Sequence, residues 1–176
     1  MRVGPPLPDH AMTQAPEDLA LVAAEVAAFP ARFMSLLLAT ASETGEPLAS
    51  YAPYLRDGGD FCVYLSELAA HTANLAARGR ASVLFIEDES ASPKLFARRR
   101  LTCQCAVFEV PRCAPEYDAL LDRFAARHGK LVEVLRGLAD FHLFRLRPES
   151  ATFVSGFGQA YAVGGEGGDD VRWLRR

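Results

Sequence analysis

The sequence has no long apolar run and no excess of positive charge. Its longest apolar stretch, Met34 to Ala41, is interrupted by Ser35 and Thr40, and it is far shorter than the roughly 20 residues that a membrane-spanning helix needs. The 19 lysines and arginines face 22 aspartates and glutamates, which gives a formal net charge of −3. Such a chain offers no basic field to nucleic acid or to an anionic membrane. We expect neither partner.

Cysteine is scarce and is not spaced as in a metal site. The four cysteines form no CxxC pair and have no His-x-His partner, so the sequence predicts reduced thiols, with neither a zinc site nor disulfides. Cys103 and Cys105 share one face of an expected strand, where core packing explains them. The first 16 residues contain four prolines and no apolar core of the kind that a secretion signal needs. The expected location is the cytoplasm.

The sequence also lacks the motifs that are typical of hydrolases and of nucleotide-binding enzymes. The chain contains no HExxH, no nucleophile elbow, no P-loop and no GxGxxG. Gly156-Phe157-Gly158 is too short for a dinucleotide fingerprint, and a bend in a strand explains it better. Hydrolase chemistry therefore has no support in the sequence.

What remains is a single globular domain with a large apolar content. Half of the 176 residues are hydrophobic and 23% are charged, which suits one domain with a real core. We expect a flexible tail over residues 1–16, a folded domain over 17–163 and a second tail over 164–176. The docking of Val171–Arg176 onto the domain stays open.

Apolar periodicity and turn residues predict the elements of this domain. Helices are predicted from Glu17 to before Pro30, from Ser66 through Ala77, from Pro115 to before Gly129 and around Leu131–Leu138. Strands are predicted at Ser35–Ala41, Leu48–Leu55, Phe61–Ser66, Ala81–Ile86, Leu101–Val110, Phe141–Arg147 and Thr152–Val163, the last broken by Gly156 and Gly158. Six or seven strands at hairpin spacing, with helices inserted between them, favour an antiparallel barrel with peripheral helices, a mainly β (α+β) fold.

Two polar clusters are candidates for an anion site. At the expected start of a helix, Ser66, His71 and Thr72 would add side-chain donors to backbone N–H groups. Arg98 and Arg100 lie two apart at the start of a strand, so both would point at one ligand. A capped helix and a solvated loop are the respective alternatives.

The other histidines favour structural roles. His128 precedes Gly129, where a cation offsets the negative end of a helix. His142 alternates with Phe141 and Leu143 and is expected to be a hydrogen-bonded residue of the barrel. Asp140 is expected to be a strand-start residue rather than an acid catalyst.

Taken together, these motifs resemble one family along most of the chain. The motifs stand in order between about Val22 and Val163, namely Ser50-Tyr51-Ala52-Pro53, Leu65–Leu75, Ile86–Ser90, Phe96–Thr102 and Gly156–Tyr161. Their sequence is similar to the pyridoxamine 5′-phosphate oxidase-related FMN-binding split-barrel proteins, and most similar to their haem-utilisation branch.

The resemblance implies a six-stranded split barrel that forms a homodimer, with two equivalent cofactor sites at the subunit interface. It implies that the isoalloxazine lies along Ser50, Tyr51, Ala52 and Pro53. The FMN phosphate would be held by Ser66, His71 and Thr72 with Asn74. Arg98 and Arg100 would close over the phosphate or the ring. The corresponding function is an FMN-dependent oxidoreductase, with no catalytic residue assigned and the flavin carrying the electrons.

Departures from the family pattern keep two other functions open. Ala69-Ala70-His71 stands where the oxidase has Ser-Arg-Lys, which removes permanent positive charge, and the substrate-binding Arg/His motif of the oxidase is absent. In the haem-utilisation branch a C-terminal histidine ligates haem, yet no histidine follows His142. A haem protein without flavin would need His71 or His142 as its axial ligand. The third alternative is a dimeric ligand-binding module without turnover.

Overall fold

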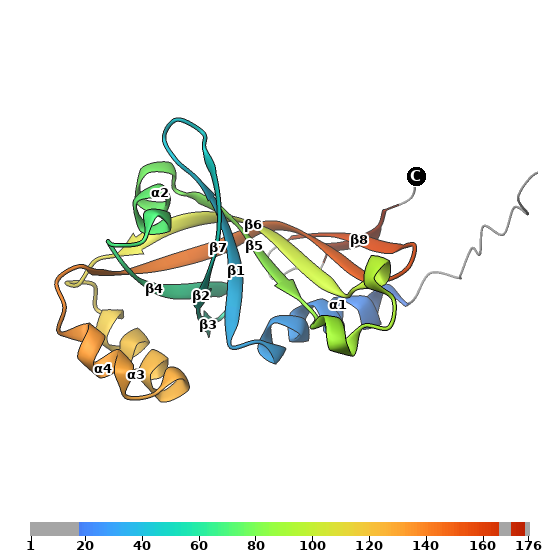
Figure 1. Ribbon diagram of the computed structural model, residues 1–176. Coiled ribbons are helices and arrows are strands. Elements are labelled where there is room, and N and C mark those ends of the chain that lie inside the picture. Colours follow the sequence, from blue (N-terminus) through green and yellow to red (C-terminus); the bar gives the residue numbers. More distant parts are fainter. Residues whose placement is uncertain (1–17, 166–169, 175–176) are drawn as a thin grey trace, which may run out of the picture.

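Antiparallel strands dominate the computed structural model, which describes residues 18–165 and 170–174. Within those residues nine strands form one sheet. They are β1 (Ser35–Ala41), β2 (Pro47–Pro53), β3 (Leu55–Asp57), β4 (Asp60–Ser66), β5 (Arg80–Ile86), β6 (Arg100–Val110), β7 (Phe141–Gly156), β8 (Gln159–Gly164) and β9 (Asp170–Trp173). The predicted mainly β, antiparallel class is confirmed (Figure 1).

The sheet closes because its two end strands are neighbours in the sequence. The hydrogen-bonded order runs β2-β1-β5-β6-β7-β4-β3, and only Tyr54 separates β2 from β3. The chain therefore passes directly from one end of the path to the other. If β2 and β3 are counted as one interrupted strand, six strands make the barrel, as the resemblance implied.

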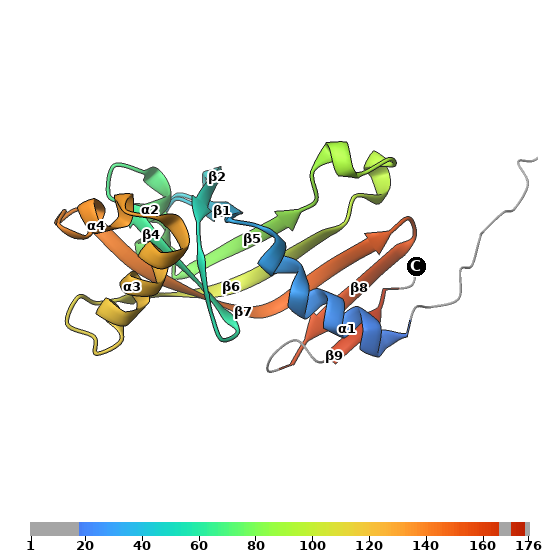
Figure 2. The same ribbon diagram turned by 90° about the horizontal axis from the view of Figure 1, so that it is seen from below.

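The longest strand, β7, belongs to two parts of the sheet. Residues Phe141–Leu146 pair with β4, whereas Ala151–Gly156 pair with β8. Strand β9 then pairs with β8, so the sheet continues into the C-terminal segment that was predicted as a tail. Figure 2 shows β7, β8 and β9 extending away from the barrel with α1 lying across them.

Four α-helices and three short 3₁₀ helices accompany the described sheet. The α-helices are α1 (Leu19–Ala28), α2 (Ala70–Arg78), α3 (Tyr117–His128) and α4 (Leu131–Arg136), and the 3₁₀ helices are η1 (Phe29–Arg32), η2 (Glu89–Ala91) and η3 (Leu95–Ala97). Helix α2 stops at Gly79, whose φ of 60° is a left-handed conformation that glycine adopts at no steric cost. Among the described residues no helix has the length and apolarity to span a membrane.

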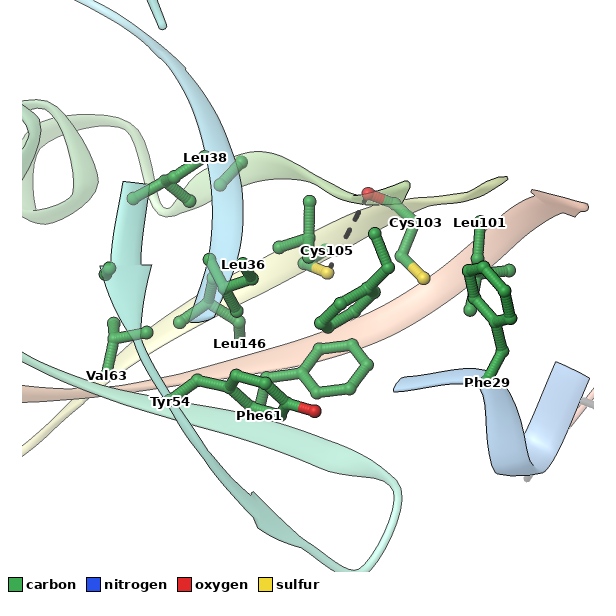
Figure 3. Close-up of a cluster of buried hydrophobic side chains, with 14 of the residues drawn as sticks. Phe29, Leu36, Leu38, Tyr54, Phe61, Val63, Leu101, Cys103, Cys105 and Leu146 are labelled. Carbon is green, nitrogen blue, oxygen red and sulfur yellow. Dashed lines mark hydrogen bonds between the residues drawn. The ribbon is translucent and has the colours of Figure 1, made fainter. Parts of the chain in front are cut away.

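Two apolar clusters hold these elements together. The larger one fills the barrel, where Tyr54 packs on Phe61, and continues to Phe29, which follows α1 (Figure 3). The smaller cluster packs α3 and α4 against β4 and β7. Burial raises the pKa of the Cys103 thiol to about 12, which keeps it protonated and confirms its assignment to core packing.

Several predicted boundaries were wrong, each for a local reason. The helix predicted from Ser66 begins at Ala70, because Ser66 completes β4 and a turn intervenes. The strand predicted over Leu48–Leu55 divides at Tyr54, where the chain crosses from β2 to β3. The strands predicted at Phe141–Arg147 and Thr152–Val163 are instead β7, which runs unbroken to Gly156, and β8, which follows a hairpin turn. The tail prediction over 1–16 lies outside the described residues.

Candidate functional site

A histidine on α2 meets a serine on the barrel edge. Ser50 lies on β2, opposite Leu38 of β1, and His71 occupies the first turn of α2. The His71 Nδ1 and the Ser50 Oγ are 2.9 Å apart. The two residues are 21 positions apart in the sequence, and the packing of α2 over the barrel brings them together (Figure 1).

The hydrogen bonds around Ser50 determine which nitrogen of His71 carries the proton. The Ser50 hydroxyl donates to the Leu38 carbonyl at 3.3 Å, and a carbonyl only accepts. The Ser50 oxygen therefore accepts from the Nδ1–H of His71, which leaves the neutral ring with a lone pair on Nε2. Burial lowers the pKa of His71 below its ordinary value, which favours this neutral form.

This arrangement has the chemistry of a metal ligand. A ligating histidine usually donates its second ring N–H to an oxygen acceptor, which fixes the tautomer and the ring orientation. His71 has that acceptor in Ser50, and no residue in the described part of the chain hydrogen-bonds its Nε2. An iron atom would accept the Nε2 lone pair, so the donor set suits haem.

The side chains predicted to hold a phosphate are mostly engaged within the protein. Ser66 Oγ donates to the Asp140 carboxylate at 2.9 Å and accepts from the Leu68 N–H. Thr72 is buried and donates to the Ser66 carbonyl at 2.6 Å. Asn74 is buried and its amide donates to Thr40 at 3.0 Å. The carboxylate beside Ser66 also opposes a phosphate electrostatically.

The remaining predicted residues of β2 divide between the two faces of the strand. Ala52 points into the barrel and is 1% exposed, whereas Tyr51 points outward and is 68% exposed. Pro53, the last residue of β2, is exposed as well. A ligand lying along Ser50–Pro53 would thus meet the Tyr51 ring and the strand backbone.

Arg98 and Arg100 lie at the other end of β5 and β6. Arg100 pairs with Ile86, whereas α2 leads into the opposite end of β5 at Arg80. Six residue steps separate these ends, about 20 Å at the rise of a strand. Within one copy of the chain, Arg98 and Arg100 therefore lie too far from His71 to share a ligand with it.

The prediction that both arginines share one strand face was wrong. Arg98 precedes β6 and closes η3, where its guanidinium donates to the Glu87 carbonyl at 2.6 and 2.8 Å and to the Glu89 carboxylate at 2.9 Å. Arg100 begins β6 and donates to the Arg98 carbonyl at 2.9 Å. The acidic loop, rather than a shared strand, thus determines where Arg98 points.

A second histidine, His142, lies where β4 and β6 end and β7 begins. His142 lies between two carboxylates, with Glu109 2.7 Å from Nδ1 and Glu67 2.7 Å from Nε2. Hydrogen bonds that the ring N–H groups donate to the Glu109 and Glu67 carboxylates raise the pKa of His142 above its ordinary value. The expectation of a hydrogen-bonded barrel histidine is confirmed, but its partners lie 33 and 75 residues away and no sequence pattern pointed to them.

His128 behaves as a structural residue. It is the last residue of α3, and its Nε2 lies 2.9 Å from the Tyr54 carbonyl. Its ring also packs on Phe124 with centroids 4.6 Å apart. The histidine therefore ties the end of α3 to the junction of β2 and β3.

Known proteins match this architecture over most of the chain. The family model described as pyridoxamine 5′-phosphate oxidase matches residues 22–155. The haem oxygenase HutZ of Vibrio cholerae is 38% identical over 142 residues, which cover 81% of each protein. These matches extend from α1 to the end of β7 and so include the whole barrel.

Solved structures of related proteins support the same family. The structure of HutZ from V. cholerae, described there as a haem storage protein, matches with a TM-score of 0.67 and 35% identity over 72% of this chain and 89% of that one. Campylobacter jejuni ChuZ matches with a TM-score of 0.79 and 29% identity over 90% of this chain, which spans 64% of the ChuZ chain. The chain therefore belongs to the pyridoxamine 5′-phosphate oxidase family, in the branch that contains HutZ.

Proposed function

We propose that this protein binds haem and acts in haem utilisation, with His71 as the axial ligand. The observation that carries the proposal is the His71–Ser50 pair, which presents an unprotonated Nε2 on a neutral imidazole. The 38% identity to a protein named haem oxygenase supports the same ligand. Bound haem would supply redox and oxygen chemistry, whereas the chain supplies the ligand and its orientation.

Exposed apolar side chains on β2 and in the turn before α2 support a flat apolar ligand. Leu68, three residues before His71, is 94% exposed, and Tyr51, next to Ser50, is 68% exposed. Large exposed apolar side chains are typical of ligand and partner surfaces. His142 is the weaker candidate for the axial ligand, because both of its nitrogens already face carboxylates.

An FMN-dependent oxidoreductase is the second candidate, supported by the match to the pyridoxamine 5′-phosphate oxidase model. In that function Ser50–Pro53 would contact the flavin ring and the start of α2 would hold the phosphate. It ranks second because Ser66, Thr72 and Asn74 are engaged within the protein and Asp140 adds a negative charge beside them.

We further propose a homodimer built on the outer face of β1 and β2. Leu37 opposes Tyr51 and Ala39 opposes Ala49 across these strands, so the outward side chains form an apolar surface. A second copy seated there would supply Arg98 and Arg100 to the α2 end of its partner. Tyr51→Asp should convert the dimer into a monomer in sedimentation equilibrium, and an unchanged mass would reject this surface.

The experiment that tests the function is an absorbance spectrum of the purified protein followed by titration with haemin and with FMN. A saturable Soret shift with haemin is the expected result. Saturable FMN binding without a Soret shift would reject haem binding and support the FMN-dependent oxidoreductase. If neither compound binds, both proposed functions are rejected in favour of a ligand-binding module without turnover.

A second stage separates two roles. Ascorbate and oxygen are added to the haemin complex while the Soret band is followed. Decay of the band with release of iron indicates an oxygenase, whereas a persistent band indicates storage. The V. cholerae relative HutZ is named both a haem oxygenase and a haem storage protein.

A further inference from the structure

A cavity of about 630 Å³ opens between α1, the β3–β4 hairpin and the strands β6 to β8. Figure 2 shows α1 passing in front of the extended part of the sheet, and residues of both line the cavity. Cavities of about 300–1,000 Å³ are typical of small-molecule sites. No residue predicted to bind a cofactor is among those that line it, so it is separate from the His71 site.

The interior of this cavity is apolar. Its wall includes Val26 from α1, Phe61 from β4, Leu101 from β6, Ala151 from β7 and Val163 from β8. These residues come from five elements, and four of them are nearly inaccessible to solvent. A ligand that enters must therefore bring an apolar body, because a polar one would lose its hydration without new hydrogen bonds.

The polar residues at the cavity leave positive charge uncompensated. Arg56 donates to two carbonyls, those of Ala27 at 2.5 Å and Gly58 at 3.1 Å, and no carboxylate in the described residues lies within 4 Å of it. Its guanidinium therefore remains available to an anion.

A second arginine at the cavity is only loosely paired. Arg147 contacts Asp60 at 3.5 Å, and that carboxylate is shared with Arg145 at 3.2 Å. The Arg147 guanidinium also lies over the Phe108 ring, 5.3 Å from its centroid, and a bound carboxylate would compete with this contact. The other acid at the cavity, Glu149, pairs with Arg80 at 2.7 Å. Asp60 and Glu149 thus each have an arginine partner that does not line the cavity. Among the described residues, Arg56 has no carboxylate partner and Arg147 shares the carboxylate of Asp60 with Arg145.

We propose that this cavity is a second ligand site, for an amphipathic carboxylate whose apolar body fills the interior and whose carboxylate meets Arg56 and Arg147. Guanidinium groups bind carboxylates through short, charge-assisted hydrogen bonds. A fatty-acid chain and the propionate-bearing face of a tetrapyrrole share this chemistry.

Calorimetric titration of the full-length protein tests the proposal, with dodecanoate below its micellar concentration as the probe. Dodecanol, which has the same chain without the charge, is the matched control ligand. Dodecanoate should bind more tightly than dodecanol. Metal-free protoporphyrin, which cannot form an iron–histidine bond, is the second probe and distinguishes the two sources of the ligand.

Three variants locate the site. Ala151→Phe should abolish dodecanoate binding by filling the cavity. Arg147→Gln should weaken it about tenfold, the effect of one charge-assisted hydrogen bond, and should leave dodecanol unaffected. Arg172→Gln, which removes an exposed arginine of β9 outside the cavity, should change nothing. Equal affinity for dodecanoate and dodecanol, or equal binding by wild type and Ala151→Phe, overturns the proposal.

Discussion

His71 on α2 and His142 on β7 have different neighbours, and these neighbours make the two histidines chemically different. His71 is half-buried, and within the described part of the chain its ring has one hydrogen-bond partner, the neutral Ser50. His142 on β7 is held by Glu67 and Glu109. Burial lowers the pKa of the first histidine, and carboxylates raise the pKa of the second.

The difference teaches that a histidine's role follows from its neighbours rather than from its sequence context. A neutral imidazole with one nitrogen held by an oxygen is ready to ligate a metal through the other. An imidazolium with both N–H groups given to carboxylates has no lone pair to offer and instead ties three strand ends together.

Removing the His71 ring should have the largest effect. In His71→Ala the haemin-induced Soret shift should disappear, whereas His142→Ala should keep it. Addition of free imidazole should restore the band in the His71 variant, which separates lost ligation from lost folding. A Soret shift that survives in His71→Ala refutes His71 as the axial ligand.

Removing the hydrogen-bond partner of His71 should have the next largest effect. Ser50→Ala leaves the Nδ1–H without its acceptor, so the proton is free to move to Nε2 and the ring is free to rotate. Haemin affinity should fall by about 10–100-fold, as for other partners of metal ligands, and Ser50→Thr should recover most of it. Equal affinities of the three proteins would show that Ser50 does not orient the ring.

His142 should affect stability and its pH dependence instead of haem. Because its folded pKa is raised, its contribution is complete below the ordinary pKa of about 6.5 and is lost as the pH rises through the folded pKa. Urea unfolding at pH 6 and pH 9 should therefore show a larger decline in wild type than in His142→Gln. The difference should stay below about 1 kcal/mol because the two carboxylates are largely exposed. Identical declines would contradict the bridge.

Single carboxylate changes should have the smallest effects. Glu67→Gln and Glu109→Gln each remove one partner of His142, and each should lower stability at pH 6 by about 0.5 kcal/mol. A double-mutant cycle with His142→Gln should give a coupling energy for each pair that vanishes at pH 9. Coupling that is unchanged by pH would mean that the imidazole is not charged in the bridge.

Local patterns predicted the elements better than their partners. The apolar run Ser35–Ala41 predicts β1 with both ends correct, and the helix predicted to end at Ala77 ends one residue later, at Arg78. The start of α2 was missed because Ser66 has the residue type of a helix cap but its hydroxyl is held by Asp140. The length of β7 was missed because its second half pairs with β8, and only the fold sets that pairing.

The sequence also predicted only part of the candidate site. Family motifs pointed to Ser50 and His71, and the fold places them 2.9 Å apart. The same motifs pointed to Arg98 and Arg100, which lie at the opposite end of β5. A linear motif indicates which residues matter, but it carries no distance between residues of different elements.

The sequence by itself determined the class of the molecule: one antiparallel, barrel-forming domain without a strong charge of either sign, in a recognisable family. Apolar patterns and turn residues act over a few positions, so the helices and strands that they predict can be recognised from the sequence alone. Only the tertiary structure decided that Ser50 sets the tautomer of His71, that two distant glutamates hold His142 and that a cavity remains beneath α1. Those properties depend on distances between elements, which are set by how side chains pack.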